Sequence, residues 1–200
     1  MSSKENTILG LKLPTDPRWV DMAAMSIEDI LTDHAYCEQK AASSCISIIQ
    51  KYSEKQRIVD ELSPIVTEEW GHFRMVLAEL TKRNMVLGKQ RKDEYVNALM
   101  LHMQKGGHVE DRLLDHLLVM ALIEARSCER FRLLSEQIDD VALQKFYHKL
   151  MISEAGHYRL FLDLAKHYIP EEKVMKRWRH WLEFETEVLN NLPLRGDRMH

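Results

Sequence analysis

The sequence contains few of the features that mark membrane, collagen-like or disulfide-stabilised proteins. No apolar run approaches the roughly 18 residues of a membrane-spanning helix, and residues 1–17 lack the apolar core of a signal peptide, so we expect no membrane partner. Only 7 Gly and 5 Pro occur in 200 residues, which excludes a low-complexity chain. The three cysteines, Cys37, Cys45 and Cys128, form no C-x-x-C pair and cannot all pair within one monomer, which favours a reducing cytoplasm.

The sequence also has no excess of positive over negative charge. The formal net charge of -3 excludes a uniformly basic nucleic-acid-binding protein, although it leaves room for a local basic patch. What the sequence does contain is 45% apolar residues in helical periodicity, within a length that fits one domain covering residues 1–200. We therefore expect a mainly helical protein with a real core.

Apolar residues at three- and four-residue steps predict five main helices. Two helical hairpins are expected at about 26–83 and 112–167, with a C-terminal helix at about 171–190. Residues 13–17 read as a turn, and Ser26 with Asp29 resembles a capping box. Pro64 either kinks the second helix or starts its main segment after a Ser63 cap. The long irregular stretch 84–111, with a short helical piece at about 94–103, suits a crossover beside a bundle.

One short motif occurs twice. "EEWGHFRMVL" begins at Glu68, and "SEAGHYRLFL" begins at Ser153, so Glu-x-Gly-His-aromatic-Arg is repeated in the two hairpins. Among the 10 histidines, only His72 and His157 have a glutamate three residues before them. The residues around Glu38 also correspond to those around Glu124. The repeat indicates that two helical hairpins have been duplicated.

The glutamates and histidines of these motifs thus occupy the apolar faces of their helices, which should pack in the core. Burying an unpaired carboxylate costs several kcal/mol, and four together could not all ionise without cations. Glu and His three residues apart share one helix face, so a pair can hold one ion while a Glu from the neighbouring helix completes the site. A single such histidine is more often an ordinary core residue, but a matched set of six favours a metal pair. Oxygen and nitrogen donors suit iron or manganese.

This pattern resembles the ferritin-like di-iron and di-manganese carboxylate superfamily, which implies an all-α, ferritin-like four-helix bundle with a long crossover between its second and third helices and an additional C-terminal helix. "LPTDPRWV" at 13–20, the two Glu-x-Gly-His copies, the length and the fifth helix together resemble the bacterial tRNA hydroxylases that act on 2-methylthio-N6-isopentenyladenosine beside the anticodon. The resemblance covers nearly the whole chain.

The resemblance implies an O2-dependent di-iron monooxygenase that hydroxylates the isopentenyl group, with tRNA as substrate, two iron ions as cofactor and an external redox protein as electron donor. It also implies the metal ligands. One iron would be held by Glu38, Glu69 and His72 and the other by Glu124, Glu154 and His157, with Glu69 and Glu154 best placed to bridge. Glu129 lies about 140° round its helix from Glu124 and is expected to face elsewhere, in a supporting or surface role such as pairing with Arg126 or Arg130.

Two basic runs are candidate RNA contacts. The run at 81–92 has no acid among its five cations, Lys82, Arg83, Lys89, Arg91 and Lys92. The run at 173–181 places Lys176, Arg177 and Arg179 among Trp178 and Trp181, and bases can stack on aromatic rings. Either run could equally be a solvated helix face.

Other functions fit the same metal pattern. A ferritin-like iron oxidase or peroxidase without an RNA substrate is the main alternative, and a manganese catalase would use a similar centre. A non-enzymatic, RNA-binding helical bundle is the alternative from a different class, which a metal content of zero would favour. Cys37 and Cys128 are expected to fill the core rather than to bind metal.

Overall fold

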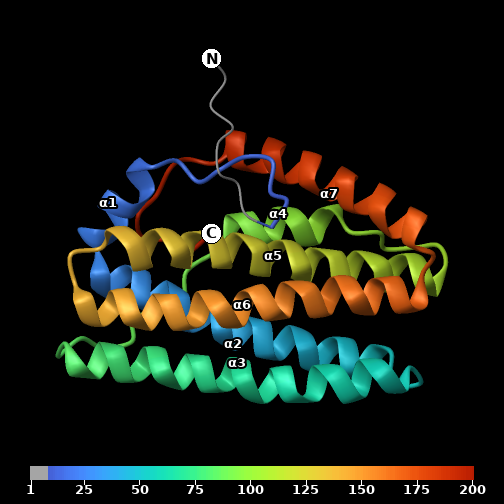
Figure 1. Cartoon of the computed structure of the whole chain (residues 1–200), viewed down its shortest axis with the longest axis horizontal. Coiled ribbons are helices and arrows are strands. Elements are labelled where there is room, and N and C mark those ends of the chain that lie inside the picture. Colours follow the sequence, from blue (N-terminus) through green and yellow to red (C-terminus); the bar gives the residue numbers. More distant parts are fainter. Residues whose placement is uncertain (1–8) are drawn as a thin grey trace. The chain divides into compact units, whose positions relative to one another are not determined.

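The computed structural model describes residues 9–200 (Figure 1). The first eight residues, on which the expectation of no signal peptide partly rests, lie outside the described part. Within that part the chain forms seven helices and no strand. They are α1 (Arg18–Ala24), α2 (Ile27–Lys51), α3 (Gln56–Lys82), α4 (Glu94–His102), α5 (Val109–Gln137), α6 (Val141–Tyr168) and α7 (Glu171–Asn191). No helix of residues 9–200 is long and apolar enough to cross a bilayer.

The chain divides into two compact units. Of the described residues, unit 1 comprises 9–21, 94–194 and 200, and unit 2 comprises 22–93 and 195–199. The expectation of one domain over the whole chain stays a prediction. Each unit contains one of the expected hairpins, because α2 packs on α3 in unit 2 and α5 packs on α6 in unit 1 (Figure 1).

In unit 2, α2 begins as expected, but its cap differs from the prediction. Ser26 occupies the N-cap position without a side-chain cap hydrogen bond, so the predicted capping box does not form. Glu28 and Asp29 in the first turn instead favour the helix through its dipole. α3 begins at Gln56 and continues through Pro64, so a start after Ser63 is wrong. Pro64 is exposed, where water can satisfy the backbone carbonyl that proline leaves unbonded.

The end of α3 and the start of α5 are set by residues with positive φ. Asn84, at φ 56, follows the last turn of α3 and lets the Met85 amide donate to the Leu80 carbonyl at 3.0 Å, which ends the helix. Gly107, at φ 81, precedes α5 and adopts a conformation that favours glycine. α5 then begins at Val109, three residues earlier than the expected start at Arg112.

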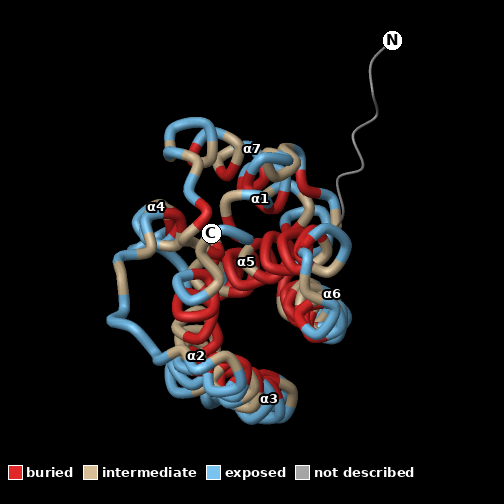
Figure 2. Tube along the Cα trace, turned by 90° about the vertical axis from the view of Figure 1, so that its left-hand side faces the viewer, coloured by how far each residue is buried: buried red, intermediate tan, exposed pale blue. Residues whose placement is uncertain are grey.

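In unit 1, α5 is the central helix, since α4, α6 and α7 all pack against it. Its tube is coloured as buried through most of its length in Figure 2. α6 is capped by Asp140, whose carboxylate accepts hydrogen bonds from the amides of Ala142 and Leu143 at 2.9 and 3.0 Å. α7 buries Trp178, Trp181 and Val188 along its apolar stripe. α5 is therefore the helix of unit 1 on which the other helices depend for their packing.

Candidate metal centre

The first triad of candidate ligands lies in unit 2. Glu38 comes from α2, whereas Glu69 and His72 come from α3, one helical turn apart. His72 Nδ1 lies 3.4 Å from Glu69 Oε2 and 3.7 Å from Glu38 Oε2. The three side chains are buried, and each offers one ligand atom within 4.8 Å of the others. Glu-x-x-His spacing and hairpin packing thus bring together the donors that the sequence predicted.

Burial makes a negative charge costly at this triad. Desolvation, together with the neighbouring Glu69 carboxylate, raises the pKa of Glu38 to about 8. The His72 imidazole partly offsets this rise in the pKa of Glu38. A second imidazole also contacts the carboxylate, since the completely buried His34 has its Nε2 2.5 Å from Glu38 Oε1. A cation beside the carboxylates would favour their ionised form, so the electrostatics of the triad suit a bound metal ion.

The second triad lies in unit 1 and repeats the first. Glu124 comes from α5, and Glu154 and His157 come from α6. His157 Nδ1 lies 3.1 Å from Glu154 Oε2, and the three residues again offer ligand atoms within 4.8 Å of one another. All three side chains are buried. Each hairpin therefore contributes one Glu from its first helix and a Glu-His pair from its second.

The structure separates Glu124 from Glu129, as the helical phase predicted. Glu129 pairs with Arg126 and accepts hydrogen bonds from the Thr15 hydroxyl at 2.6 Å and the Thr15 amide at 3.2 Å. Pairing with Arg126 is the supporting role that the sequence suggested. The alternative of a surface role is wrong, because Glu129 is only 1% exposed.

Arg126 is the centre of a buried polar cluster in unit 1. Its guanidinium donates to Glu185 Oε1 at 2.9 Å and to the Leu13 carbonyl at 2.9 Å. The Tyr95 hydroxyl donates to the same Glu185 oxygen at 2.9 Å. The cluster joins α4, α5 and α7 to the segment before α1, so its groups satisfy one another away from water. Neither acid of the cluster, Glu129 or Glu185, belongs to a group of candidate metal ligands among the described residues.

The first basic run, in unit 2, is mostly engaged in ion pairs. Lys82 and Arg83 both bind the carboxylate of Glu79, at 2.5 Å each. Arg91 lies 3.0 Å from Asp29 and 3.1 Å from Asp197. Of the five candidate RNA-binding residues, Lys89 and Lys92 are the exposed ones for which the described residues show no ion pair. RNA binding by the five remains a prediction, which now rests chiefly on these two lysines.

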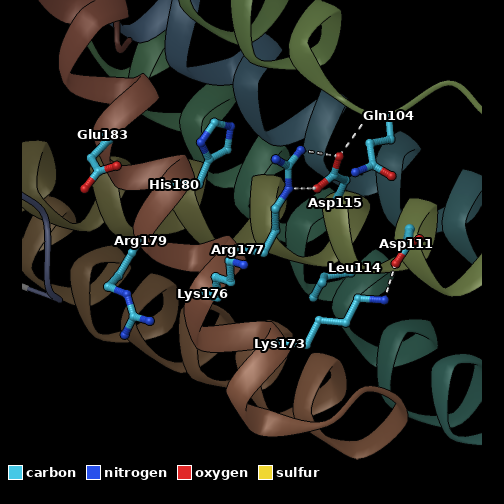
Figure 3. Close-up of a pocket in the computed structure, with 10 residues that line it drawn as sticks. All are labelled: Gln104, Asp111, Leu114, Asp115, Lys173, Lys176, Arg177, Arg179, His180 and Glu183. Atoms are coloured by element: carbon cyan, nitrogen blue, oxygen red, sulfur yellow. Dashed lines mark hydrogen bonds and ion pairs between the residues drawn. The ribbon is translucent and has the colours of Figure 1, made fainter.

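The second basic run differs from its expected form. Trp178 and Trp181 are buried, at 4% and 0% exposure, so bases cannot stack on them. Lys176 and Arg179 are exposed, whereas Arg177 packs over the Trp181 ring and binds the buried Asp115. All three cations line a pocket shown in Figure 3. Amphipathic packing explains the difference, because a helix that buries its aromatic face presents the intervening cations to solvent.

The donor set fits iron. The test of this fit is the chemistry of the residues. Each triad supplies two carboxylates and one imidazole, a mixture that suits iron or manganese, and the cysteines take no part in either triad. Cys128 is buried and its thiol donates to the Met151 carbonyl at 3.3 Å, as expected of a core residue, whereas Cys37, for which the same was expected, is half-buried.

Sequence reasoning missed three functional or structural features. His34 stood on the apolar stripe one turn before Glu38, and its i,i+4 spacing was the available signal. Glu185 stood four residues after Trp181 on the buried face of α7, which could have marked it as a buried acid. α1 was not predicted, and its seven residues carry too little periodicity to identify a helix.

Comparison with known proteins gives a consistent result. The family model described as tRNA-(MS[2]IO[6]A)-hydroxylase (MiaE) matches residues 3–200. A Pseudomonas putida protein, named tRNA 2-(methylsulfanyl)-N(6)-isopentenyladenosine(37) hydroxylase, is 37% identical over 166 residues, covering 83% of this chain and 80% of the relative. A Salmonella typhimurium protein of the same name is 28% identical over 239 residues, covering 95% and 87%.

A solved structure supports the fold. A chain described as "Protein 43 with aldehyde deformylating oxygenase activity from Synechococcus" matches with a TM-score of 0.90 and 35% identity, covering 95% of this chain and 94% of that one. The expected all-α, ferritin-like class is thereby confirmed. A family match over nearly the full length, together with the Pseudomonas relative, identifies the chain as a member of the MiaE family of tRNA hydroxylases.

Proposed function

We propose that this protein is an O2-dependent, non-haem di-iron monooxygenase that hydroxylates the isopentenyl group of 2-methylthio-N6-isopentenyladenosine in tRNA, next to the anticodon. The observation that carries the proposal is the pair of matched, buried Glu and Glu-x-x-His triads in a chain of the MiaE family. The names of the Pseudomonas and Salmonella relatives support the substrate. Because cytoplasmic tRNA would be the substrate, we place the protein in the cytoplasm.

Each triad would hold one iron ion. Glu38, Glu69 and His72 are the proposed ligands of one ion, and the corresponding residues of α5 and α6 are those of the other, namely Glu124, Glu154 and His157. Bridging by Glu69 and Glu154 is inferred from the family resemblance alone. When bound, the two irons would supply O2 activation for insertion of one oxygen atom into a C–H bond. The second oxygen atom leaves as water, which requires two protons and two electrons from a redox protein.

The chain's own residues prepare the site for this reaction. His34 orients the Glu38 carboxylate through the contact at 2.5 Å. On α5, Met120 lies one turn and Leu117 two turns before Glu124, and both are buried with it. On α6, Phe161 lies one turn after His157 and is completely buried. These apolar side chains exclude water from the triad of unit 1 and suit the prenyl group of the proposed substrate.

Other activities of a di-iron centre differ from the proposed one in their substrates. An iron oxidase or peroxidase without an RNA substrate would use the same triads, but the names of the matched family and of both curated relatives favour a tRNA hydroxylase. The Synechococcus chain is described by an aldehyde deformylating oxygenase activity, so an aldehyde belongs in the assay as a competing substrate.

The direct test uses tRNA from cells that lack the protein. This tRNA is incubated with the iron-reconstituted protein, a chemical reductant and isotopically labelled O2. The tRNA is then digested to nucleosides, which are separated by chromatography and identified by mass spectrometry. We expect 2-methylthio-N6-isopentenyladenosine to gain one labelled oxygen atom. A Glu154→Ala variant serves as the inactive control. Iron oxidation or aldehyde consumption without any labelled nucleoside would contradict the proposal.

A further inference from the structure

A pocket of about 600 Å³ lies in unit 1, between α7, the start of α5 and the segment after α4 (Figure 3). Its volume falls within the range of pockets that bind small molecules or parts of larger ones. Its lining is strongly charged, and it consists of Gln104, Asp111, Leu114, Asp115, Lys173, Lys176, Arg177, Arg179, His180 and Glu183. The proposed hydroxylation gives this pocket no role.

The acids of the pocket are each neutralised by a cation. Arg177 binds Asp115 through two hydrogen bonds of 2.7 and 2.8 Å. Lys173 pairs with Asp111, and Glu183 accepts from Lys12 at 2.8 Å. The dashed lines of Figure 3 show the first two of these pairs.

Lys176 and Arg179 carry the excess positive charge. Both are exposed, and no ion pair within residues 9–200 involves either of them. They lie three residues apart on α7, so their side chains leave the same face of the helix and can converge on one anion. Two cations without an internal counterion at the edge of a pocket are suited to an anionic ligand.

Stacked rings adjoin these two cations. The exposed His180 ring lies with its centroid 5.1 Å from that of His102, at an interplanar angle of 27°. His102 in turn stacks on Phe184 at 3.7 Å and 11°. His180 Nε2 lies 2.9 Å from His102 Nε2, so a hydrogen bond between the two ring edges holds the exposed His180 ring in place. Flat rings beside cations are the combination that holds a splayed nucleotide, because the base stacks while the phosphate is neutralised.

We propose that this α7 pocket binds one nucleotide of the tRNA substrate, away from the modified adenosine, with its phosphate on Lys176 and Arg179 and its base against His180. The inference rests on the proposed function, because it takes tRNA as the partner. It places a binding site on a different face of α5 from the metal ligands. Asp115 lies about 13 Å along the helix axis from Glu124 and about half a turn round it.

An acidic redox protein is the competing ligand. Its carboxylates would also be attracted to Lys176 and Arg179, but they would make no use of the exposed His180 ring. The exposed His180 ring, held in place by His102, therefore favours RNA over an acidic protein surface. Binding remote from the reacting carbon also predicts a specific kinetic signature, since the pocket would contribute to substrate affinity and not to the chemical step.

The test reverses the charge of Lys176 and Arg179. The Lys176→Glu and Arg179→Glu double variant is compared with the wild type for binding of fluorescently labelled tRNA across a range of salt concentrations. We expect about a tenfold higher Kd at low salt, together with a salt dependence that is shallower by about one unit for each phosphate that the variant no longer neutralises. In the hydroxylation assay KM should rise while kcat stays the same.

A matched control separates a local effect from that of net charge. Lys145 and Lys149 are exposed on α6 of the same unit and do not line the pocket. The Lys145→Glu and Lys149→Glu variant makes the same change in total charge. We expect its tRNA affinity to stay near that of the wild type. An equal loss of affinity in both variants would overturn the proposal, because it would show a nonspecific effect of charge.

A separate variant tests the stacking of a base on His180. His180→Ala should weaken tRNA binding without altering the salt dependence, because stacking releases no counterions, and His180→Phe should restore the affinity. Unchanged binding by His180→Ala would overturn the assignment of the base.

The remaining outcomes are also decisive. If the wild type binds and hydroxylates tRNA but the Lys176 and Arg179 variant binds it equally well, the pocket proposal fails and the proposed function stands. If that variant instead slows only reduction by a protein electron donor, with activity on chemical reductant unchanged, the pocket binds the redox partner and the RNA assignment is overturned. If the wild type neither binds nor modifies tRNA, the proposed function itself fails.

Discussion

The buried imidazole of His34 lies 2.5 Å from the carboxylate of Glu38, one turn further along α2. Glu38 belongs to the triad of unit 2, so a side chain outside the triad fixes one of its oxygens. Histidine and carboxylate partners of this kind orient metal ligands, and their removal typically weakens metal binding roughly 10- to 100-fold.

We therefore expect His34→Ala to bind ferrous iron roughly 10- to 100-fold more weakly than the wild type. His34→Gln, which keeps a hydrogen-bond donor near Glu38, should recover part of the affinity. Iron titration of the purified protein measures both effects, and His148→Ala, at an exposed site on α6, is the control. Equal iron affinity in His34→Ala and the wild type would show that the contact does not support the site.

The register of α5 gives a second prediction. Glu124→Ala removes a proposed ligand and should lower the iron content from about two ions per chain, whereas Glu129→Ala should keep both. Glu129→Ala should instead destabilise the fold by about 3–5 kcal/mol, because it removes one partner of the buried Arg126. Elemental analysis and chemical unfolding of both variants measure these effects. The reverse pattern of iron loss would show that the triad assignment on α5 is wrong.

The first basic run can now be tested without disturbing its ion pairs. Reversing Lys89 and Lys92 to Glu should weaken tRNA binding and flatten its salt dependence if this run contacts phosphates. Arg91 is left intact, because it holds Asp29 and Asp197 and its removal would change the local structure. Binding is measured by fluorescence anisotropy, and iron content should stay constant. A salt dependence identical to that of the wild type would identify the run as a solvated surface.

Cys128 should be almost inert to alkylation. Burial raises the pKa of the Cys128 thiol to about 12, so at pH 8 the group stays protonated. Relative to a thiol with the ordinary pKa of 9.0, the reactive thiolate is about 1,000-fold scarcer. Peptide mapping after iodoacetamide treatment should show slow labelling in the folded protein and fast labelling in urea. Rapid labelling under native conditions would mean that the residue is not buried in solution.

The sequence was informative wherever function depends on local spacing. Glu69 with His72, and Glu154 with His157, could be identified from three-residue steps, because the α-helix fixes which side chains share a face. The same periodicity chose Glu124 over Glu129 and predicted the two hairpins to within a few residues. Helical phase is a property of consecutive residues, so it can be read without knowing what the helix packs against.

The tertiary structure determined which hydrogen-bond or ion-pair partner each polar side chain has. Glu129 pairs with Thr15 from a segment 114 residues away, and the Trp181 indole donates to Asp115 across 66 residues. Burial excluded Trp178 and Trp181 from the candidate RNA surface, and ion pairs engaged Arg91. Lys176 and Arg179 remained exposed at the edge of a pocket. Burial and pairing depend on neighbours that are distant in sequence, and the free energy of a charged side chain depends on those neighbours. The local sequence therefore determined the helical faces and the triads within each hairpin, whereas only the folded chain determined which cations remain available to a ligand.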